Sequence, residues 1–326
     1  MLVPYDSSDL RTIYAVRIDD DLSGQSVRAV LTRMASVSQS ILRRAKRLKG
    51  VRVNGDEARV STIVKTGDLV ELLDVCRHDR AIAPEPVHLS IVYEDARLVV
   101  VDKPAGMLVH PVKRHRSGTI ANGLAWLYLV RGEKSGIHPI HRLDRGTSGL
   151  VLIAKDSLTH SQIARQLLER RLKRVYIALV EGVLPEDSGV LDAPLEVVPG
   201  SFIERRTAAD EATGLPARTR YEVVERMPGR TLLRISLDTG RTHQIRVHLS
   251  SAGYPLVGDT LYGSSSEDIM RQALHACEVS FVHPGHPDGF AQPCLGRHCE
   301  CATSRRMTLC SQLPADFQSV VGASRE

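Results

Sequence analysis

The sequence predicts an α+β fold, in which a mainly antiparallel mixed sheet follows a small unit of helices and short strands. Apolar residues recur at helical spacing twice near the N-terminus, in 27–34 and in 41–48. From residue 91 to about residue 317, strand-like runs outnumber helical ones, and few neighbouring strands are joined by the helical crossovers of a parallel sheet. A hydrophobic content of 42% over 326 residues excludes disorder for most of the chain.

The small unit is predicted to span residues 22–76. Gly50 ends its second helix, and the alternating residues Val51–Val53 form a short strand before an Asn-Gly turn. Residues 63–72 are expected to form two strands around a Gly-Asp turn.

The segments on either side of this unit have different compositions. Residues 1–21 are acidic and weakly patterned, so we expect an N-terminal extension. Residues 77–90 contain two prolines and few apolar residues, which is typical of a stiff linker. The remainder, 91–326, is predicted to be one larger domain.

The larger domain is predicted to alternate strands with a few helices. An amphipathic helix is expected over 157–173. The expected strands are Ile91–Glu94, Leu98–Val101, Leu150–Ala154, Tyr176–Val180, Thr219–Val224, Thr231–Leu237 and Ile245–Leu249.

The net charge of +5 is too small to indicate or exclude a nucleic-acid partner. The positions of the charged residues along the chain are more informative. Residues 28–59 hold nine Lys and Arg against two acids. The apolar runs are far shorter than the roughly 20 residues of a membrane span. The N-terminus lacks the basic start and apolar stretch of a signal peptide. We therefore expect a cytoplasmic protein with no membrane partner.

A basic run at residues 43–52 is dense enough to predict a surface that follows phosphates. A solvated helix face is the alternative interpretation. The residues expected to contact RNA here are Arg43, Arg44, Lys46, Arg47, Lys49 and Arg52.

The densest chemical signal is the run from His141 to Leu150. Asp144 stands between two arginines in it, and nearby cations favour the ionised carboxylate that a nucleophile or base requires. A simple turn is the alternative. Ser148 does not fit a hydrolase nucleophile, because the elbow motif requires glycine where this chain has Leu150.

Two further clusters are polar and basic. Residues 238–249 include Arg241, Gln244 and Arg246, which suit phosphate or ribose on a strand edge, although a solvated basic strand fits as well. Residues 170–176 place four cations before Tyr176. This tyrosine could stack on a base or belong to the core.

These motifs resemble the RluA family of RNA pseudouridine synthases. The resemblance extends over about 91–284, in ordered blocks. The segments that carry it are Lys103–Gly106, Val109–Pro111, His141–Asp144 with Thr147–Gly149, Tyr176–Gly182, Gly240–His248, Gly253–Asp259 with Tyr262-Gly263, Leu274–Ala276 and Phe281–Pro284. Relative to the family, residues 285–306 resemble a Cys-rich insertion.

The resemblance implies roles for individual residues. Asp144 would be the essential carboxylate, Arg241 its ion-pair partner, and Tyr176 the residue that stacks on the target base. Arg142 would fill the space of the flipped-out uridine. Further RNA contacts are expected from His141, Lys173, Arg174 and Arg246.

The small unit resembles the RNA-binding module named after ribosomal protein S four. Val51–Gly55 and Thr66–Asp68 carry this likeness. Together, the two resemblances imply a monomeric isomerase that needs no cofactor and acts on 23S-type ribosomal RNA. A catalytically silent RNA-binding assembly factor is the alternative. The presence of Asp144, Tyr176 and Arg241 argues against that alternative.

Four cysteines gather near the C-terminus: Cys294, Cys299, Cys301 and Cys310. Thiolates bind zinc, but this spacing differs from the Cys-x2-Cys pairs of zinc sites. We expect reduced thiols rather than a metal site.

Overall fold

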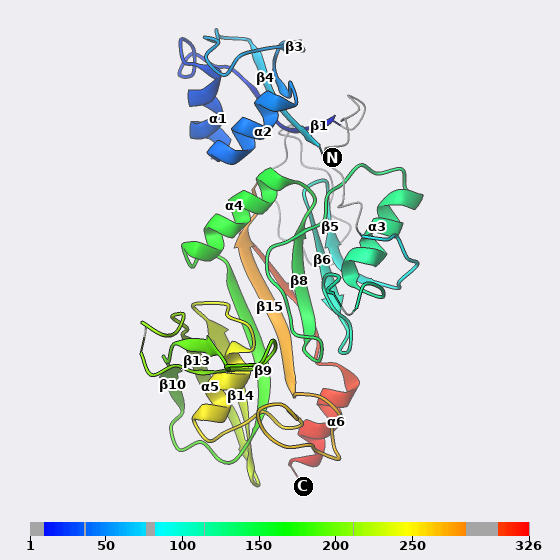
Figure 1. The fold of residues 1–326 in the computed structure, drawn as a ribbon, viewed down its shortest axis with the longest axis vertical. Helices are drawn as coiled ribbons and strands as arrows, with labels where there is room; N and C mark the ends of the chain where they lie inside the picture. The colour runs from blue at the N-terminus through cyan, green and yellow to red at the C-terminus, as the bar shows by residue number, and fades with distance from the viewer. Residues whose placement is uncertain are drawn as a thin grey trace.

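The computed structural model describes residues 10–35, 37–75, 82–113, 115–210, 212–284 and 306–325. It contains a four-stranded sheet, a ten-stranded sheet and a two-stranded hairpin (Figure 1). The elements of the small unit are β1 (Leu10–Arg17), α1 (Val27–Ala35), α2 (Gln39–Arg47), β2 (Val51–Val53), β3 (Asp56–Glu57) and β4 (Leu69–Val75).

The small sheet has the order β1-β4-β2-β3. Both predicted helices form, and most of their apolar positions, including Val30, Leu31 and Leu42, are buried in the core of this unit, whereas Met34 is exposed. Residues 10–17, expected to lie in an extension outside the unit, form the edge strand β1 and pair antiparallel with β4. Ile13 on β1 is fully buried, so this strand completes the core.

Of the two strands expected in residues 63–72, the second forms and the first does not. Ile63 makes an isolated bridge with Ser26, while β4 begins at Leu69. Gly67 turns the chain with a φ of 92°, in the left-handed region that glycine adopts readily.

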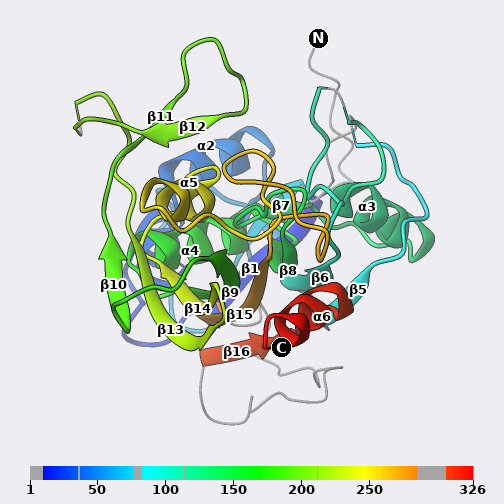
Figure 2. The same cartoon turned by 90° about the horizontal axis from the view of Figure 1, so that it is seen from below.

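The large unit confirms the predicted α+β class. Its sheet has the order β10-β13-β14-β9-β15-β8-β6-β5, with β8 and β15 parallel and the other neighbours in this path antiparallel. Its elements are β5 (Ser90–Glu94), β6 (Leu98–Lys103), α3 (Ile120–Val130), β7 (His138–Pro139), β8 (Ser148–Ala154), α4 (Ser157–Leu168), β9 (Lys173–Glu181), β10 (Ser188–Leu191), β11 (Leu195–Val197), β12 (Arg205–Thr207), β13 (Thr219–Met227), β14 (Arg230–Leu237), α5 (Gln244–Ser251), β15 (Leu274–Val282), β16 (Arg306–Cys310) and α6 (Ala315–Ala323). Figure 2 shows the β11–β12 hairpin projecting from the body.

Two elements of the large unit differ from the prediction. Helix α4 ends at Leu168, because Arg170 has a φ of 57° and breaks the helical geometry. The expected strand Ile245–Leu249 is instead part of helix α5. Residues 244–249 are all buried, so the alternation of Ile245, Val247 and Leu249 does not mark one face and cannot distinguish strand from helix.

The two units share a buried boundary. Arg97 of the large unit is 1% exposed and donates from Nη1 to the Ile13 carbonyl oxygen at 2.7 Å. Arg11 of the small unit donates from Nη2 to the Ala96 carbonyl oxygen at 2.6 Å. Leu158 of α4 belongs to the apolar core of the small unit. These contacts join the two units over polar and apolar surface.

Candidate active site

The loop between β7 and β8 presents Asp144. The Asp144 carbonyl oxygen accepts a hydrogen bond from Thr147 N–H at 3.1 Å, which forms a turn before β8. Gly149 has a φ of 109°, and a Cβ there would lie 2.2 Å from the Ala276 carbonyl oxygen on β15. The close parallel contact of β8 and β15 therefore requires this glycine. The Asp144 side chain is 24% exposed and accessible to a substrate.

Ser148 lies in the sheet below Asp144 and cannot serve as a hydrolase nucleophile in this position. It is 3% exposed, and its Oγ lies 2.9 Å from Nδ1 of His275. The Ser148 hydroxyl is therefore hydrogen-bonded within the protein interior and does not face a substrate.

Asp144 pairs with Arg246 rather than with Arg241. Nη1 of Arg246 lies 3.4 Å from Oδ2 of Asp144. Nε and Nη2 of Arg246 donate to the two carboxylate oxygens of Asp259 at 2.7 Å each. Arg241, the expected partner, donates from Nε to the Pro216 carbonyl oxygen at 3.0 Å. The predicted ion-pair partner was therefore wrong. The expected contact of Arg246 with RNA stays a prediction.

The start of helix α5 explains this change of partner. Arg241 precedes the helix, whereas Arg246 lies within its first turn and is 8% exposed. Burial by itself lowers the pKa of Arg246. The hydrogen bonds and the negative charge of Asp259 raise it by more, so the net shift of the pKa is upward. The Asp144 carboxylate thus has a permanent cation beside it, held in place by a bidentate contact.

His243 and Tyr262 complete the polar side of the site. Tyr262 Oη accepts from Arg205 N–H at 2.8 Å and lies 2.8 Å from Nδ1 of His243. Nε2 of His243 lies 3.9 Å from Oδ2 of Asp144. Burial lowers the pKa of His243, which favours the neutral ring. The Arg246 guanidinium lies 4.9 Å from the Tyr262 ring centroid.

Tyr176 lies on β9 at the floor of the site. It is 4% exposed and belongs to the main apolar cluster of the large unit. Burial raises its pKa, Arg174 lowers it, and the charge of Asp144 raises it further. Tyr176 is therefore a core residue, as one of the two interpretations held, and it lies within the electrostatic reach of Asp144. Its stacking on a base stays a prediction.

Lys103 connects the Asp144 loop to the loop after β6. Its side chain is fully buried, and Nζ donates to the carbonyl oxygens of Pro104, Met107 and Arg145 at 3.1, 2.9 and 3.2 Å. These three acceptors match the three donors of an ammonium group. Because Arg145 follows Asp144 directly, Lys103 holds the chain at the position where the carboxylate emerges.

The buried Lys103 predicts a pH-dependent stability. Burial lowers its pKa to about 7, whereas the unfolded chain keeps a pKa near 10.5. The unfolded state therefore binds more protons between pH 7 and 10.5, so this group adds stability as the pH rises through that window. Compared with Lys103→Met, the wild type should gain about 2 kcal/mol in unfolding free energy between pH 7 and pH 9.

Denaturant unfolding of both proteins at the two pH values measures this difference. Lys173→Met is the matched control, because Lys173 is exposed at the start of β9 and should show no such gain. Parallel stability curves for the wild type and Lys103→Met would contradict the expected shift.

Two of the predicted RNA contacts face inward. His141 is 8% exposed and Arg174 is 6% exposed. Burial lowers the pKa of His141 to about 3, so it carries no charge for a phosphate at neutral pH. Arg174 donates from Nη2 to the Thr239 carbonyl oxygen at 3.3 Å. Lys173 is exposed because neighbouring residues of a strand point to opposite faces, and Arg142 is also exposed.

The basic run of the small unit is divided by the fold. Arg43, Lys46 and Arg47 on α2 and Lys49 after it are exposed. Arg44 instead contacts Asp74 and Ser157 at the boundary between the two units. Arg52 is partly exposed on β2, where its register partners on the neighbouring strands are the acids Glu57 and Glu71. The exposed basic surface therefore consists mainly of the C-terminal half of α2.

The cysteine prediction falls largely outside the described residues, because Cys294, Cys299 and Cys301 belong to the segment 285–305. Cys310 is exposed at the end of β16. In the described part of the chain, none of the helices has both the length and the apolar character that crossing a bilayer requires.

Comparison with known proteins assigns the chain to a family. Residues 97–251 match the family described as RNA pseudouridylate synthase. The protein named Uncharacterized RNA pseudouridine synthase YhcT, from Bacillus subtilis, is 36% identical over 275 residues, which cover 82% of this chain and 89% of that protein. The chain belongs to the RluA family of RNA pseudouridine synthases. This synthase is also 39% identical to Ribosomal large subunit pseudouridine synthase D of Nitrosomonas europaea, over 82% of this chain and 80% of that protein.

The fold of the synthase has solved counterparts. The structure described as Human RNA Pseudouridylate Synthase Domain Containing 4 superposes with a TM-score of 0.55 at 22% identity, covering 72% of this chain and 93% of that one. Sequence reasoning missed the site roles of Lys103, His243, Asp259 and Tyr262. All four stand in segments that carry the family resemblance, and this is the signal that could have identified them.

Proposed function

We propose that this synthase converts uridine to pseudouridine in large-subunit ribosomal RNA, with Asp144 as the essential carboxylate. The observation that carries the catalytic assignment is the accessible Asp144 beside Arg246, which Asp259 holds in place. The substrate class is supported by the relatives named Ribosomal large subunit pseudouridine synthase D.

The proposed reaction rearranges bonds within one nucleotide. The N1–C1′ bond breaks, the uracil turns, and C5 joins C1′. N1 gains a proton and C5 loses one, so the isomerisation requires no oxidant and no cofactor. An ionised carboxylate serves this reaction either as a nucleophile at C1′ or as a base on the ribose, and Arg246 lies beside Asp144 in either case.

Two further residues have proposed roles around the target uridine. The Tyr176 ring on β9 would contact the face of the uracil and assist in proton transfer. The exposed Arg142, two residues before Asp144, would occupy the space that the uridine leaves in the RNA. Extruding a base costs a few kcal/mol, so a side chain that fills the gap stabilises the bound state.

A tritium-release assay tests the proposed function. The purified chain is incubated with a transcript of large-subunit ribosomal RNA that carries C5-tritiated uridine, and the modified position is then mapped. We expect release of tritium from this transcript. Release from transfer RNA alone would overturn the proposed substrate, and failure to release tritium from either RNA would favour the alternative of a non-catalytic RNA-binding factor.

We also propose that the small unit is an RNA-binding module of the kind named after ribosomal protein S four, and that the exposed cations of α2 bind RNA. The triple variant Arg43→Ala, Lys46→Ala, Arg47→Ala should weaken RNA affinity. It should also reduce the slope of log affinity against log salt by about 2, because each lost phosphate contact removes roughly 0.7 to 0.9 from the slope. Filter binding at a series of salt concentrations measures this slope.

A matched triple variant controls for the loss of charge. Arg131, Arg226 and Arg325 each form an ion pair with an acid, respectively Glu94, Asp187 and Glu225. Replacing these three with alanine should leave the salt slope unchanged. Equal slopes for both triple variants would reject α2 as the RNA-binding surface.

A further inference from the structure

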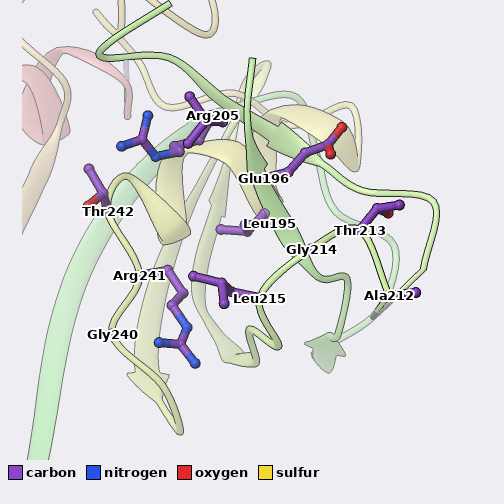
Figure 3. Close-up of a pocket in the computed structure, with 11 residues that line it drawn as sticks. Leu195, Glu196, Arg205, Ala212, Thr213, Gly214, Leu215, Gly240, Arg241 and Thr242 are labelled. Atoms are coloured by element: carbon purple, nitrogen blue, oxygen red, sulfur yellow. The ribbon is translucent and has the colours of Figure 1, made fainter. Parts of the chain in front are cut away.

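A pocket lies between the β11–β12 hairpin and the segment before α5 (Figure 3). Its volume is about 620 Å³, within the usual range of roughly 300 to 1,000 Å³ for ligand sites. Leu195 and Leu215 form an apolar part of its wall, while Arg205 and Arg241 line it with positive charge. An apolar surface next to guanidinium groups suits a ligand with a flat base and a phosphate.

Arg241 is available to such a ligand. It is exposed, and its Nε donates to the Pro216 carbonyl oxygen at 3.0 Å, which orients the guanidinium. Among the described residues, no carboxylate forms an ion pair with it. Glu196, an acid in the pocket wall, is paired with Arg206 at 2.7 Å. The positive charge of Arg241 is therefore left for an anion.

The wall of the pocket adjoins residues of the active site along the chain and through the Tyr262 hydroxyl. Thr242 in its wall precedes His243, which contacts Tyr262 and lies 3.9 Å from Asp144. Arg205, on the opposite wall, donates its backbone N–H to the same Tyr262 hydroxyl. A ligand in the pocket therefore lies beside the residues that surround Asp144. A nucleotide joined by one phosphate to a uridine at Asp144 is therefore the ligand that we consider for this pocket.

We propose that this pocket binds the nucleotide next to the target uridine, with Arg241 on its phosphate and its base against the exposed Leu215. The proposal rests on the proposed function, because it assumes a uridine at Asp144. Arg241, which does not pair with Asp144, would bind the RNA backbone in this pocket. Arg241 is thus a binding residue, and its loss should affect affinity more than the chemical step.

Three variants of the full chain test the pocket. Arg241→Ala removes the charge, Arg241→Lys keeps it, and Leu215→Trp fills the pocket from a side chain that is 59% exposed. Arg325→Ala is the matched control, because Arg325 pairs with Glu225 and does not line the pocket. Binding is measured by fluorescence anisotropy with a labelled oligouridylate at several salt concentrations. Turnover is measured by tritium release at saturating RNA.

We expect Arg241→Ala to raise Kd about tenfold and to reduce the salt slope by about 0.7, the value for one contact to a single strand. Arg241→Lys should keep the wild-type slope. Leu215→Trp should raise Kd without changing the slope, and kcat should stay within about threefold for Arg241→Ala because the catalytic group is intact.

Two outcomes overturn the pocket proposal. One is an Arg241→Ala protein with the Kd and slope of Arg325→Ala. The other is a loss of kcat at unchanged Kd, which would place Arg241 in the chemical step. The binding readout needs no turnover. A wild type that releases no tritium would therefore reject the proposed function, while the anisotropy data would still decide the pocket.

Discussion

Asp144→Asn is expected to lower tritium release from C5-labelled RNA by at least about 10³-fold. Asparagine keeps the size of the side chain but cannot act as an anionic nucleophile or base. Arg246 should remain in place, because Asp259 still holds it through two hydrogen bonds of 2.7 Å. The loss should therefore reflect the chemistry of one carboxylate.

The control for Asp144→Asn is RNA binding by the same protein. Its Kd should stay within a few-fold of the wild-type value, and its unfolding midpoint should change little, because the Asp144 side chain is partly exposed. Turnover near the wild-type rate would show that another group performs the reaction.

Arg246→Met is expected to have the second largest effect, on both activity and stability. Turnover should fall by about 10²-fold or more, because the cation beside Asp144 is lost. Asp259 is 1% exposed and would lose its bidentate partner, which should cost about 3 kcal/mol of unfolding free energy. Tritium release and denaturant unfolding measure the two effects.

Two companion variants separate these effects. Arg246→Lys retains a charge but not the planar pair of donors that Asp259 receives, so it should restore activity and stability only in part. Arg241→Met should keep kcat and the unfolding free energy, because Arg241 is exposed and contacts neither Asp144 nor Asp259. If Arg241→Met lost turnover while Arg246→Met retained it, the ion pair would have to be reassigned.

Local sequence patterns predicted the elements whose environment is simple. Helix α2 buries Ile41, Leu42 and Ala45 on one face and exposes cations on the other, so its periodicity identifies it. Strand β8 is a continuous apolar run that is buried along its length. Asp144 was selected because it stands between two arginines in the dense polar run directly before this strand, and because the run resembles a family motif.

The same patterns failed where burial surrounds an element. Helix α5 is covered on all sides, so the alternating apolar residues Ile245, Val247 and Leu249 indicated a strand. Strand β1 was overlooked because its acidic neighbours masked a half-buried edge strand. In both cases the missing information was which parts of the chain cover the segment.

The partner of Asp144 was also beyond local reasoning. Arg241 and Arg246 stand five positions apart, and either has the right chemistry. The choice depends on where α5 begins and on Asp259, which anchors Arg246 from a loop after the helix. Likewise, no pattern around Lys103 indicates that its ammonium group bonds the carbonyl oxygen of Arg145, 42 positions further along the chain.

The sequence by itself determined the α+β class and the family, because these depend on periodicity and on residues close together in the chain. It also predicted Asp144 as the essential carboxylate. Tertiary structure decided which arginine pairs with Asp144 and which predicted cations face solvent, Arg241 among them. Those outcomes depend on contacts between distant segments. A charged group loses its hydrating water only when distant segments pack around it. This desolvation decides whether the group pairs inside the protein or stays exposed to solvent.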